Sequence, residues 1–257
     1  MTPPLGRRAA AEAVGTALLV TVVVGSGIQA TGLSHDAGVR LLADSLATVF
    51  GLGVLITLFG PVSGAHFNPA VTLAVWFTGR RAPDGLAARD VAAYVPAQIA
   101  GAVCGAALAD AMFAEPLVRF SAHDRSAGHL LLGEVVATAG LIALILGLDR
   151  TARAALAPVA VASYIGAAYW FTSSTSFANP AVTIGRAFTD TFAGIAPASV
   201  PPFIAAQLLG TVVGLGAVAV VHGRPGPASK KAVLRDRPAQ VADPGPLAHG
   251  EPEPASP

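Results

Sequence analysis

The triplet Asn-Pro-Ala occurs twice in the chain, at 68–70 and at 179–181. Asparagine is a preferred N-cap because its side-chain oxygen accepts a hydrogen bond from a free backbone N–H, and proline is favoured at the first helical position. Each triplet therefore predicts a helix start, with the positive end of the helix dipole at Asn68 or Asn179. If the two starts meet, they repel cations, and the free asparagine amides donate hydrogen bonds to the oxygens of a passing neutral solute.

About ten residues of mixed apolar character follow each triplet, and as a helix they span about 15 Å, half of a bilayer core. The stretches before the triplets, GPVSGAHF at 60–67 and FTSSTSFA at 171–178, are polar and rich in small residues. Their backbone groups would be unpaired against lipid, so they must line a water-filled path. His66, in the first stretch, is a candidate pore-lining residue.

The composition is that of a membrane protein. Of the 257 residues, 53% are hydrophobic and 12% are charged, against about 25% charged in a soluble domain, and the mean hydropathy is +0.63. Apolar stretches of about 18 residues or more are long enough to span a bilayer. They run from residues 9 to 30, 41 to 60, 91 to 113, 130 to 148, 154 to 171 and 201 to 221.

Other classes of protein fit the composition poorly. The single cysteine, Cys104, excludes an internal disulfide and a multi-cysteine metal site, and we expect neither a metal nor a cofactor. A net charge of +1 argues against nucleic-acid binding. Aspartate and histidine are too sparse in the spans to provide an acid and base pair, which argues against an enzyme.

The distribution of Lys and Arg predicts the orientation in the membrane, because these residues resist translocation. With the N-terminus in the cytoplasm, four of the sixteen Lys and Arg lie outside, and the other twelve lie on the cytoplasmic side. The four are Arg40, Arg119, Arg125 and Arg186. Both termini are then cytoplasmic.

The two halves of the chain match at three anchor points that occur in the same order. EAVGTALLV from Glu12 matches EVVATAGLI from Glu134, the two Asn-Pro-Ala stretches match, and AQIAGAVCGAALA from Ala97 matches AQLLGTVVGLGAV from Ala206. Each half holds three spans, an odd number, so the second half must be inverted in the membrane.

These observations predict the division of the chain into domains. A short cytoplasmic N-terminus precedes a channel domain, and a proline-rich tail with almost no apolar run, expected to be disordered, follows it. The predicted bounds are 1–8 for the N-terminus, 9–222 for the channel domain, about 9–113 and 130–222 for its two repeats, and 223–257 for the tail.

The stretch SGAHFNPAVT at 63–72 and the second Asn-Pro-Ala resemble the signature loops of the aquaporin, or major intrinsic protein, family, from about Glu12 to Val221. The resemblance implies an all-α membrane protein: six transmembrane helices and two re-entrant half-helices in an inverted repeat that forms a right-handed bundle. It also implies a homotetramer with a pore in every protomer. The pore motifs would be Asn68, Pro69, Ala70, Asn179, Pro180 and Ala181.

The same resemblance gives two glutamates a supporting role, and the sequence itself suggests such roles for glutamines and glycines of the spans. Glu12 and Glu134 would accept hydrogen bonds from the backbones of the re-entrant loops, since ionisable groups inside spans usually face the protein interior. Gln98 and Gln207 would tie helices to these loops through their amides. Glycines recur at a spacing of four and allow close helix packing: Gly101, Gly105, Gly210 and Gly214.

Family members narrow outside the Asn-Pro-Ala region at four positions, and this sequence departs from the common pattern there. Val182 follows the second triplet, where the family usually has arginine, and Ser176 lies three residues before Asn179. The second-span position is Phe50 if FGLG is the anchor and Thr48 if residues are counted without a gap. The fifth-span position also depends on a one-residue shift. The candidates are Phe50 or Thr48, Ala167 or Gly166, Ser176, and Val182.

A filter of Phe, a small residue, Ser and Val lacks the His that narrows water-selective members and the Arg that supplies fixed charge. Selectivity depends on the pore diameter and on the donors and acceptors that line it. We therefore expect a wider, more apolar filter that admits glycerol and other polyols as well as water. Arg186 lies four residues beyond Val182, one turn further out, and could guard the outer vestibule.

Val182 and the run FANPAVTIGRAFTDTFAGI at 177–195 resemble a bacterial branch of aquaglyceroporins found in arsenic-resistance operons. This implies a bacterial inner membrane and permeation of undissociated arsenite or related metalloid acids. We expect a passive channel whose partners are small neutral solutes and the lipid bilayer. The alternatives are an ion-coupled secondary transporter, a water-selective channel, and a structural membrane protein with a closed pore.

Overall fold

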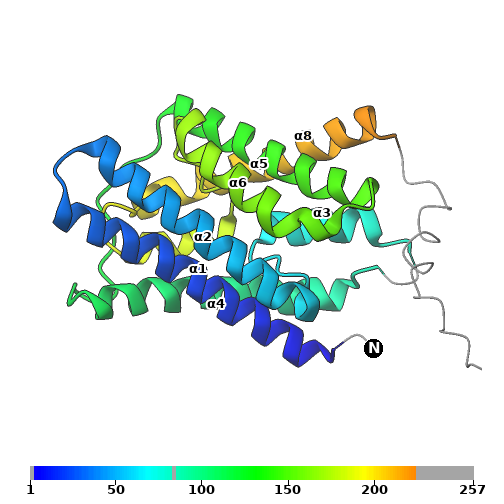
Figure 1. Ribbon diagram of the computed structural model, residues 1–257, viewed down its shortest axis with the longest axis horizontal. Coiled ribbons are helices and arrows are strands. Elements are labelled where there is room, and N and C mark those ends of the chain that lie inside the picture. Colours follow the sequence, from blue (N-terminus) through cyan, green and yellow to red (C-terminus); the bar gives the residue numbers. More distant parts are fainter. Residues whose placement is uncertain (1–2, 83–84, 224–257) are drawn as a thin grey trace, which may run out of the picture. The chain divides into compact units, whose positions relative to one another are not determined.

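The computed structural model describes residues 3–82 and 85–223 of the protein. The predicted tail, 223–257, lies outside this part except for Gly223. All secondary structure in the described part is helical (Figure 1), and it includes six helical segments that are long and apolar enough to cross a membrane. The corresponding helices are α1 (Leu5–Leu33), α2 (Ala37–Ser63), α4 (Ala88–Met112), α5 (Gly128–Arg150), α6 (Ala157–Phe171), which extends the 3-10 turn η1 (Ala154–Leu156), and α8 (Val200–Val221), which follows the 3-10 turn η3 (Pro197–Ser199).

Two short helices begin at the Asn-Pro-Ala triplets, α3 (Pro69–Gly79) and α7 (Pro180–Gly185). The predicted length of about ten residues holds for α3, which has eleven. The second half-helix is shorter, because α7 ends after six residues and tightens into the 3-10 turn η2 (Arg186–Phe188). At this point the backbone oxygen of Arg186 accepts a hydrogen bond from the N–H of Ile195 at 3.2 Å instead of continuing the helix.

The long helices lie side by side, and the start of α1 and the end of α8 lie at the same end of the bundle (Figure 1). We call this the N-terminal end and the opposite one the far end. Helix α1 packs against α4 and α2, α5 packs against α8, and α2 packs against α6. The pairs α1–α4 and α5–α8 are equivalent in the predicted repeat. The predicted all-helical membrane architecture is confirmed.

Glycines bring the paired helices of each repeat close together. A side chain at Gly101 or Gly105 of α4 would collide with the backbone oxygens of Ala13 and Ala17 in α1. In the second repeat, a Cβ atom at Gly210 or Gly214 of α8 would lie 2.6 Å from a backbone oxygen of α5 in either case. The prediction that the spacing of four serves close helix packing is confirmed, and this packing fixes the walls between which the re-entrant loops are held.

Candidate functional site: the meeting point of two half-helices

The two asparagines cap the half-helices, as N-cap residues do. Oδ1 of Asn68 accepts a hydrogen bond from the N–H of Ala70 at 2.9 Å. Oδ1 of Asn179 accepts hydrogen bonds from the N–H groups of Ala181 at 3.0 Å and Val182 at 3.2 Å. In both helices proline occupies the first turn, where its missing N–H costs nothing.

The side-chain amides of the same asparagines join the two repeats. Nδ2 of Asn68 donates to the backbone oxygen of Ala178 at 2.7 Å, and Nδ2 of Asn179 donates to the backbone oxygen of Phe67 at 2.8 Å. The two helix starts therefore meet inside the bundle. This corrects the expectation that both amides are entirely free: each uses one N–H to hold the opposite loop. An amide has two N–H groups, so one on each asparagine is left for a solute.

Residues in left-handed backbone conformations shape both loops. Ala65 and Phe67 in the first loop have φ values of 49° and 50°, and Thr175, Ser176 and Ala178 in the second have values of 61°, 52° and 48°. Such conformations cost about 1–3 kcal/mol each outside glycine and persist only where the surroundings enforce them. The loops must therefore be held in place from outside.

Buried carboxylates supply this support. Glu12 of α1 accepts hydrogen bonds from the N–H groups of His66 at 3.0 Å and Phe67 at 2.6 Å. Glu134 of α5 accepts from the N–H groups of Phe177 at 2.9 Å and Ala178 at 2.8 Å. Both glutamates are fully buried. The two loops are thus tied in the same way to the first helix of their own repeats.

One glutamine links each carboxylate to the half-helix beside it. Nε2 of Gln98 donates to Glu12 at 2.8 Å and to the hydroxyl of Thr72 at 2.9 Å. Gln207 repeats this arrangement, donating at 2.7 Å to Glu134 and at 2.8 Å to the hydroxyl of Thr183. Thr72 and Thr183 are not among the residues predicted from the sequence. The available signal was their identical place in the two copies of NPAVT.

His66 lies beside the first half-helix and is half-buried. Its Nδ1 is 3.1 Å from the hydroxyl oxygen of Thr72, and its ring meets the ring of Tyr94 edge-on, with centroids 5.6 Å apart. The Tyr94 hydroxyl donates to the backbone oxygen of Ser63 at 2.8 Å. The imidazole is therefore positioned by Thr72 of α3 and by Tyr94 of α4.

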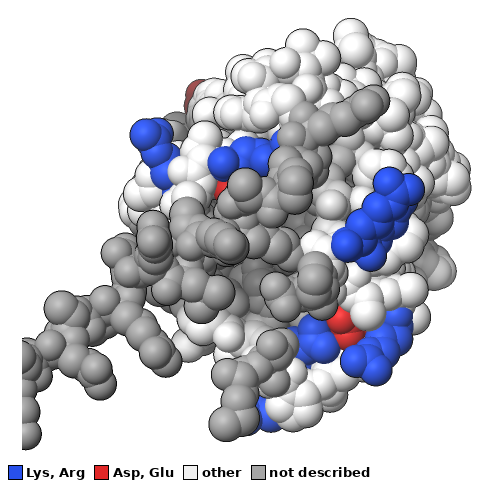
Figure 2. Space-filling view, turned by 90° about the vertical axis from the view of Figure 1, so that its right-hand side faces the viewer, with Lys and Arg blue, Asp and Glu red and all other residues white. Residues whose placement is uncertain are grey.

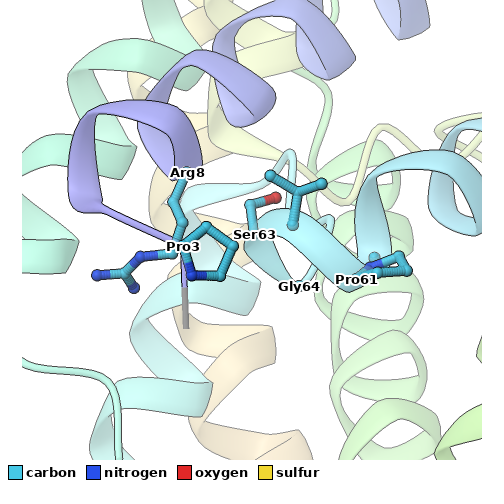
Figure 3. A pocket seen from close by; sticks show the side chains of 7 residues that line it. Pro3, Arg8, Pro61, Ser63 and Gly64 are labelled. Carbon is cyan, nitrogen blue, oxygen red and sulfur yellow. The ribbon is translucent and has the colours of Figure 1, made fainter. Parts of the chain in front are cut away.

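A cavity of about 470 Å³ opens at the N-terminal end, next to the first loop (Figure 3). Its wall is formed by Pro3 and Arg8 on one side and by residues 60–64 on the other. Arg8 is held there by an ion pair with Asp90, at 2.9 Å between Nη2 and Oδ1. The cavity therefore borders the polar stretch that leads to Asn68.

The structure contradicts the assignment of Phe50 to the filter. Phe50 is 70% exposed and shares the outer face of α2 with Leu46 and Val54. The alternative, Thr48, is 2% exposed, and its hydroxyl oxygen lies 3.2 Å from the hydroxyl oxygen of Tyr169. Thr48 therefore lies on the inner face of α2, whereas Phe50 faces away from the bundle.

The assignment of Ala167 is contradicted for the same reason. Ala167 lies on the exposed face of α6 together with Val159. Gly166 lies where a Cβ atom would collide with the side chain of Val49 on α2, so it serves the contact between these helices. The inner face of α6 instead presents Tyr169, which the sequence analysis missed. Its signal was a polar aromatic residue in an otherwise apolar span.

Comparison with known proteins agrees with this geometry. A family model described as Major intrinsic protein matches residues 2–177. The chain belongs to the major intrinsic protein family. Members of this family are membrane channels, so the protein is a multi-pass membrane channel and not an enzyme.

Similar proteins carry the names aquaglyceroporin, glycerol uptake facilitator and aquaporin. The chain is 52% identical to "Aquaglyceroporin AqpS" of Rhizobium meliloti, over 82% of this chain and 88% of the relative. It is 33% identical to the "Glycerol uptake facilitator protein" of Pseudomonas aeruginosa, over 87% of this chain and 91% of the relative. The solved structure of the aquaglyceroporin from Plasmodium falciparum matches with a TM-score of 0.63 over 85% of this chain and 97% of that chain; at 22% identity it supports the fold alone.

Two further filter candidates, Ser176 and Val182, are buried. Ser176 precedes Asn179 in the sequence, and Val182 follows it. The hydroxyl of Ser176 is one of the buried polar atoms in the described chain without a hydrogen-bond partner. Arg186 lies beyond Val182, toward the far end, where the backbone oxygen of Ala187 accepts a hydrogen bond from the loop residue Ser121 at 3.1 Å. The far side of the meeting point thus has hydroxyl groups, an apolar valine and a buried guanidinium.

Proposed function

We propose that the protein is a passive channel for water, glycerol and similar small uncharged solutes, with the path running between the two half-helices. The observation that carries this proposal is the meeting of the two helix starts through Asn68 and Asn179. Two positive helix ends, each equivalent to about half an elementary charge, repel cations at this point. The remaining N–H of each asparagine is a donor to the oxygen of a neutral solute, so oxygen-bearing solutes are favoured over ions.

The proposed filter consists of Thr48, Tyr169, Ser176 and Val182. Apart from the tyrosine these side chains are small, and valine stands where the family usually carries arginine. Pore selectivity follows the diameter and the donors and acceptors along the wall, so this set favours polyols. The names of two relatives, an aquaglyceroporin and a glycerol uptake facilitator, support the same class of solute.

Undissociated metalloid acids such as arsenite belong to the proposed range. At neutral pH arsenite is an uncharged trihydroxide of about the size of glycerol, so a filter that passes one fits the other. We propose this as the finer activity of the channel. The test is arsenite uptake by proteoliposomes, with glycerol as a competing solute on the same side of the membrane.

The proposed orientation places both termini in the cytoplasm of a bacterial cell, with the channel in the inner membrane. Arginine side chains gather around the N-terminal end of the bundle (Figure 2), and Arg7, Arg80, Arg81 and Arg89 are exposed there. Such cations favour the cytoplasmic side. We further propose a homotetramer, because apolar residues such as Val54, Val159 and Val213 are exposed on the outer faces of the helices and are suited to lipid or to neighbouring protomers.

The test uses purified protein in liposomes, with stopped-flow light scattering under sucrose and then glycerol gradients, and Val182→Arg as the comparison. Wild type should pass both water and glycerol. The arginine variant should keep water flux and lose about tenfold or more of glycerol flux, as expected when bulk and charge enter a solute site. Fluxes equal to those of empty liposomes would refute an open channel. Glycerol accumulation driven by a sodium or proton gradient would favour an ion-coupled transporter instead.

A further inference from the structure

The far half of the channel contains a buried arginine in a fixed position. Arg186 is 3% exposed and begins the 3-10 turn that follows α7. Its Nε donates a hydrogen bond to the backbone oxygen of Ala193, and its guanidinium carbon lies 3.4 Å from the centre of the Phe177 ring. The hydrogen bond and the stacked ring together fix the plane of the guanidinium.

This guanidinium has donors to spare. It carries five N–H groups, and among the described residues only the backbone oxygen of Ala193 accepts a hydrogen bond from it. The ion pairs in direct contact within residues 3–82 and 85–223 are Arg8 with Asp90 and Arg119 with Asp190, so no carboxylate touches Arg186. A donor without an acceptor in a nearly buried position is costly. The four N–H groups of the Nη atoms are therefore suited to a molecule in the channel.

A buried carboxylate balances this charge from the other side. Asp44, four residues before Thr48 on the inner face of α2, is 2% exposed, and its Oδ1 accepts a hydrogen bond from the Ser26 hydroxyl at 2.9 Å. No group in the described chain donates a hydrogen bond to its second oxygen. Asp44 and Arg186 attract each other electrostatically without touching. The acceptor oxygens of Asp44 and the donor nitrogens of Arg186 are therefore neighbours that lie more than 4.0 Å apart.

Hydroxyl groups lie near the same two charges. Tyr169, linked to Thr48, interacts electrostatically with both Asp44 and Arg186. Ser176 immediately precedes the ring on which Arg186 stacks. The residue is 3% exposed, and its buried hydroxyl has no hydrogen-bond partner in the described residues. The unpaired hydroxyl is a second observation, separate from the two charged groups. Both observations favour a binding site for a ligand that carries oxygen atoms.

The other charges near Arg186 cancel. Arg125, on the loop before α5, lies with its guanidinium carbon 5.1 Å from the centre of the Phe177 ring. Burial and the charge of Arg186 lower the pKa of Arg125 to about 10, so it stays protonated at neutral pH. Glu134 lies within electrostatic range of both arginines. With two cations and two carboxylates, Asp44 and Glu134, the cluster is neutral overall.

We propose that Arg186 and Asp44 form a charge-paired selectivity site that binds solutes with adjacent hydroxyl groups between the guanidinium donors and the carboxylate acceptor. A hydroxyl group both donates and accepts hydrogen bonds, so a polyol can bridge the two charges. The site takes the place of the arginine that is absent at Val182, one helical turn further from the meeting point. Because the pair is neutral together, it discriminates against both signs of ion. This inference rests on the proposed channel function.

The test measures glycerol flux, water flux and ion leak in proteoliposomes for single variants of each partner. Arg186→Gln should lower the ratio of glycerol to water flux about tenfold, the effect of losing hydrogen bonds from a charged group. The same variant should raise potassium or proton leak, because a net negative charge remains. Asp44→Asn leaves a net positive charge and should raise nitrate leak, also on the order of tenfold.

Two further variants separate charge from structure. Arg186→Lys keeps the charge without the planar fork, so it should lose the preference for glycerol while still excluding potassium. Arg119→Gln removes an arginine whose side chain is 63% exposed and paired with Asp190 at the far end, and it should match wild type in every flux. An ion leak in the Arg119 variant as large as in the Arg186 variant would overturn the proposal.

The measurements separate failure of the charge-paired site from failure of the channel function. If wild type passes neither water nor glycerol, the channel function fails. If wild type passes both, and Arg186→Gln and Asp44→Asn keep its flux ratio and its ion exclusion, the charge-paired site fails while the channel stands. If Arg186→Gln yields no folded protein, Asp44→Asn decides alone, since an unchanged nitrate leak in that variant also refutes the site.

Discussion

Replacing Glu134 with glutamine tests whether the buried carboxylates hold the re-entrant loops. Glu134 accepts three hydrogen bonds, from the N–H groups of Phe177 and Ala178 and from Gln207. Glutamine has nearly the same shape but turns one acceptor oxygen into an NH₂ donor. If its oxygen keeps the two bonds made by Oε2, the N–H of Phe177 and the new NH₂ group face each other as two donors without acceptors.

The size of the effect follows from this count. A buried donor that loses its acceptor costs about 1–3 kcal/mol, so two such groups cost about 2–6 kcal/mol. The two remaining hydrogen bonds also weaken, because they lose their charged acceptor. A loss of this size is a large part of the 5–15 kcal/mol that typically stabilises a folded protein, and it falls on a loop with three left-handed residues, at 175, 176 and 178.

The assay is thermal unfolding of the detergent-solubilised protein together with water flux in liposomes. Glu134→Gln should lower the unfolding temperature and abolish or strongly reduce flux. The matched control is Thr138→Val, one turn further along α5, because the hydroxyl of Thr138 is buried without a partner in the described chain. Its removal should leave both measurements unchanged or raise the unfolding temperature. A Glu134→Gln variant as stable and permeable as the Thr138 control would refute the supporting role.

Two further predictions concern packing and the filter. Gly105→Ala should destabilise the protein by about 1–3 kcal/mol or more, since its methyl group would collide with the backbone of Ala17. Gly216→Ala should stabilise the protein by about 0.5–1 kcal/mol, because the added methyl meets no atom within 4 Å apart from its own stretch of helix. Equal unfolding temperatures for the two variants would contradict the packing argument. Thr48→Phe should narrow the path and reduce glycerol flux more than water flux, while Phe50→Ala on the outer face of α2 should change neither. Solute selectivity that responds to position 50 and not to position 48, measured in the same stopped-flow assay, would refute the inner-face assignment.

Local features of this protein were predictable from sequence, and features that depend on which side of a helix faces inward were not. The Asn-Pro-Ala caps depend on residues within one turn, and the glutamates and glutamines follow from the repeat. The assignment of the filter residues, in contrast, requires that the alignment of α2 and α6 is exact to one residue. Two residues along an α-helix correspond to a rotation of about 200°, so a two-residue difference in alignment moves the assignment from Thr48 to Phe50, on the opposite face. The same interval separates Ala167 from Tyr169.

The pairing of Asp44 with Arg186 also could not be predicted from the sequence. Asp44 lies within a predicted span, but its relation to Arg186 depends on how α2 packs beside the loop that follows α7. The two residues are far apart in the sequence, and the internal repeat does not relate them: with Asn68 aligned to Asn179, the counterpart of Arg186 is Val75. A carboxylate in an apolar span is expensive and usually functional, and that was the available signal.

An arginine at position 186 instead of 182 separates two roles, narrowing the path and supplying a positive charge, which one residue at position 182 would combine. At position 182 a guanidinium would occupy the narrow part of the path and also supply its charge. At position 186 it lies four residues later, about 6 Å along a helix, so Val182 and Ser176 can leave room for a bulky solute while the charge remains in the channel. Asp44 then becomes necessary, because an unpaired guanidinium facing a wider path would attract anions. Val182, Arg186 and Asp44 therefore act together in setting the selectivity. Adding Val182→Arg to the Arg186→Gln variant should restore the exclusion of ions that the single variant loses, but it should not restore glycerol flux.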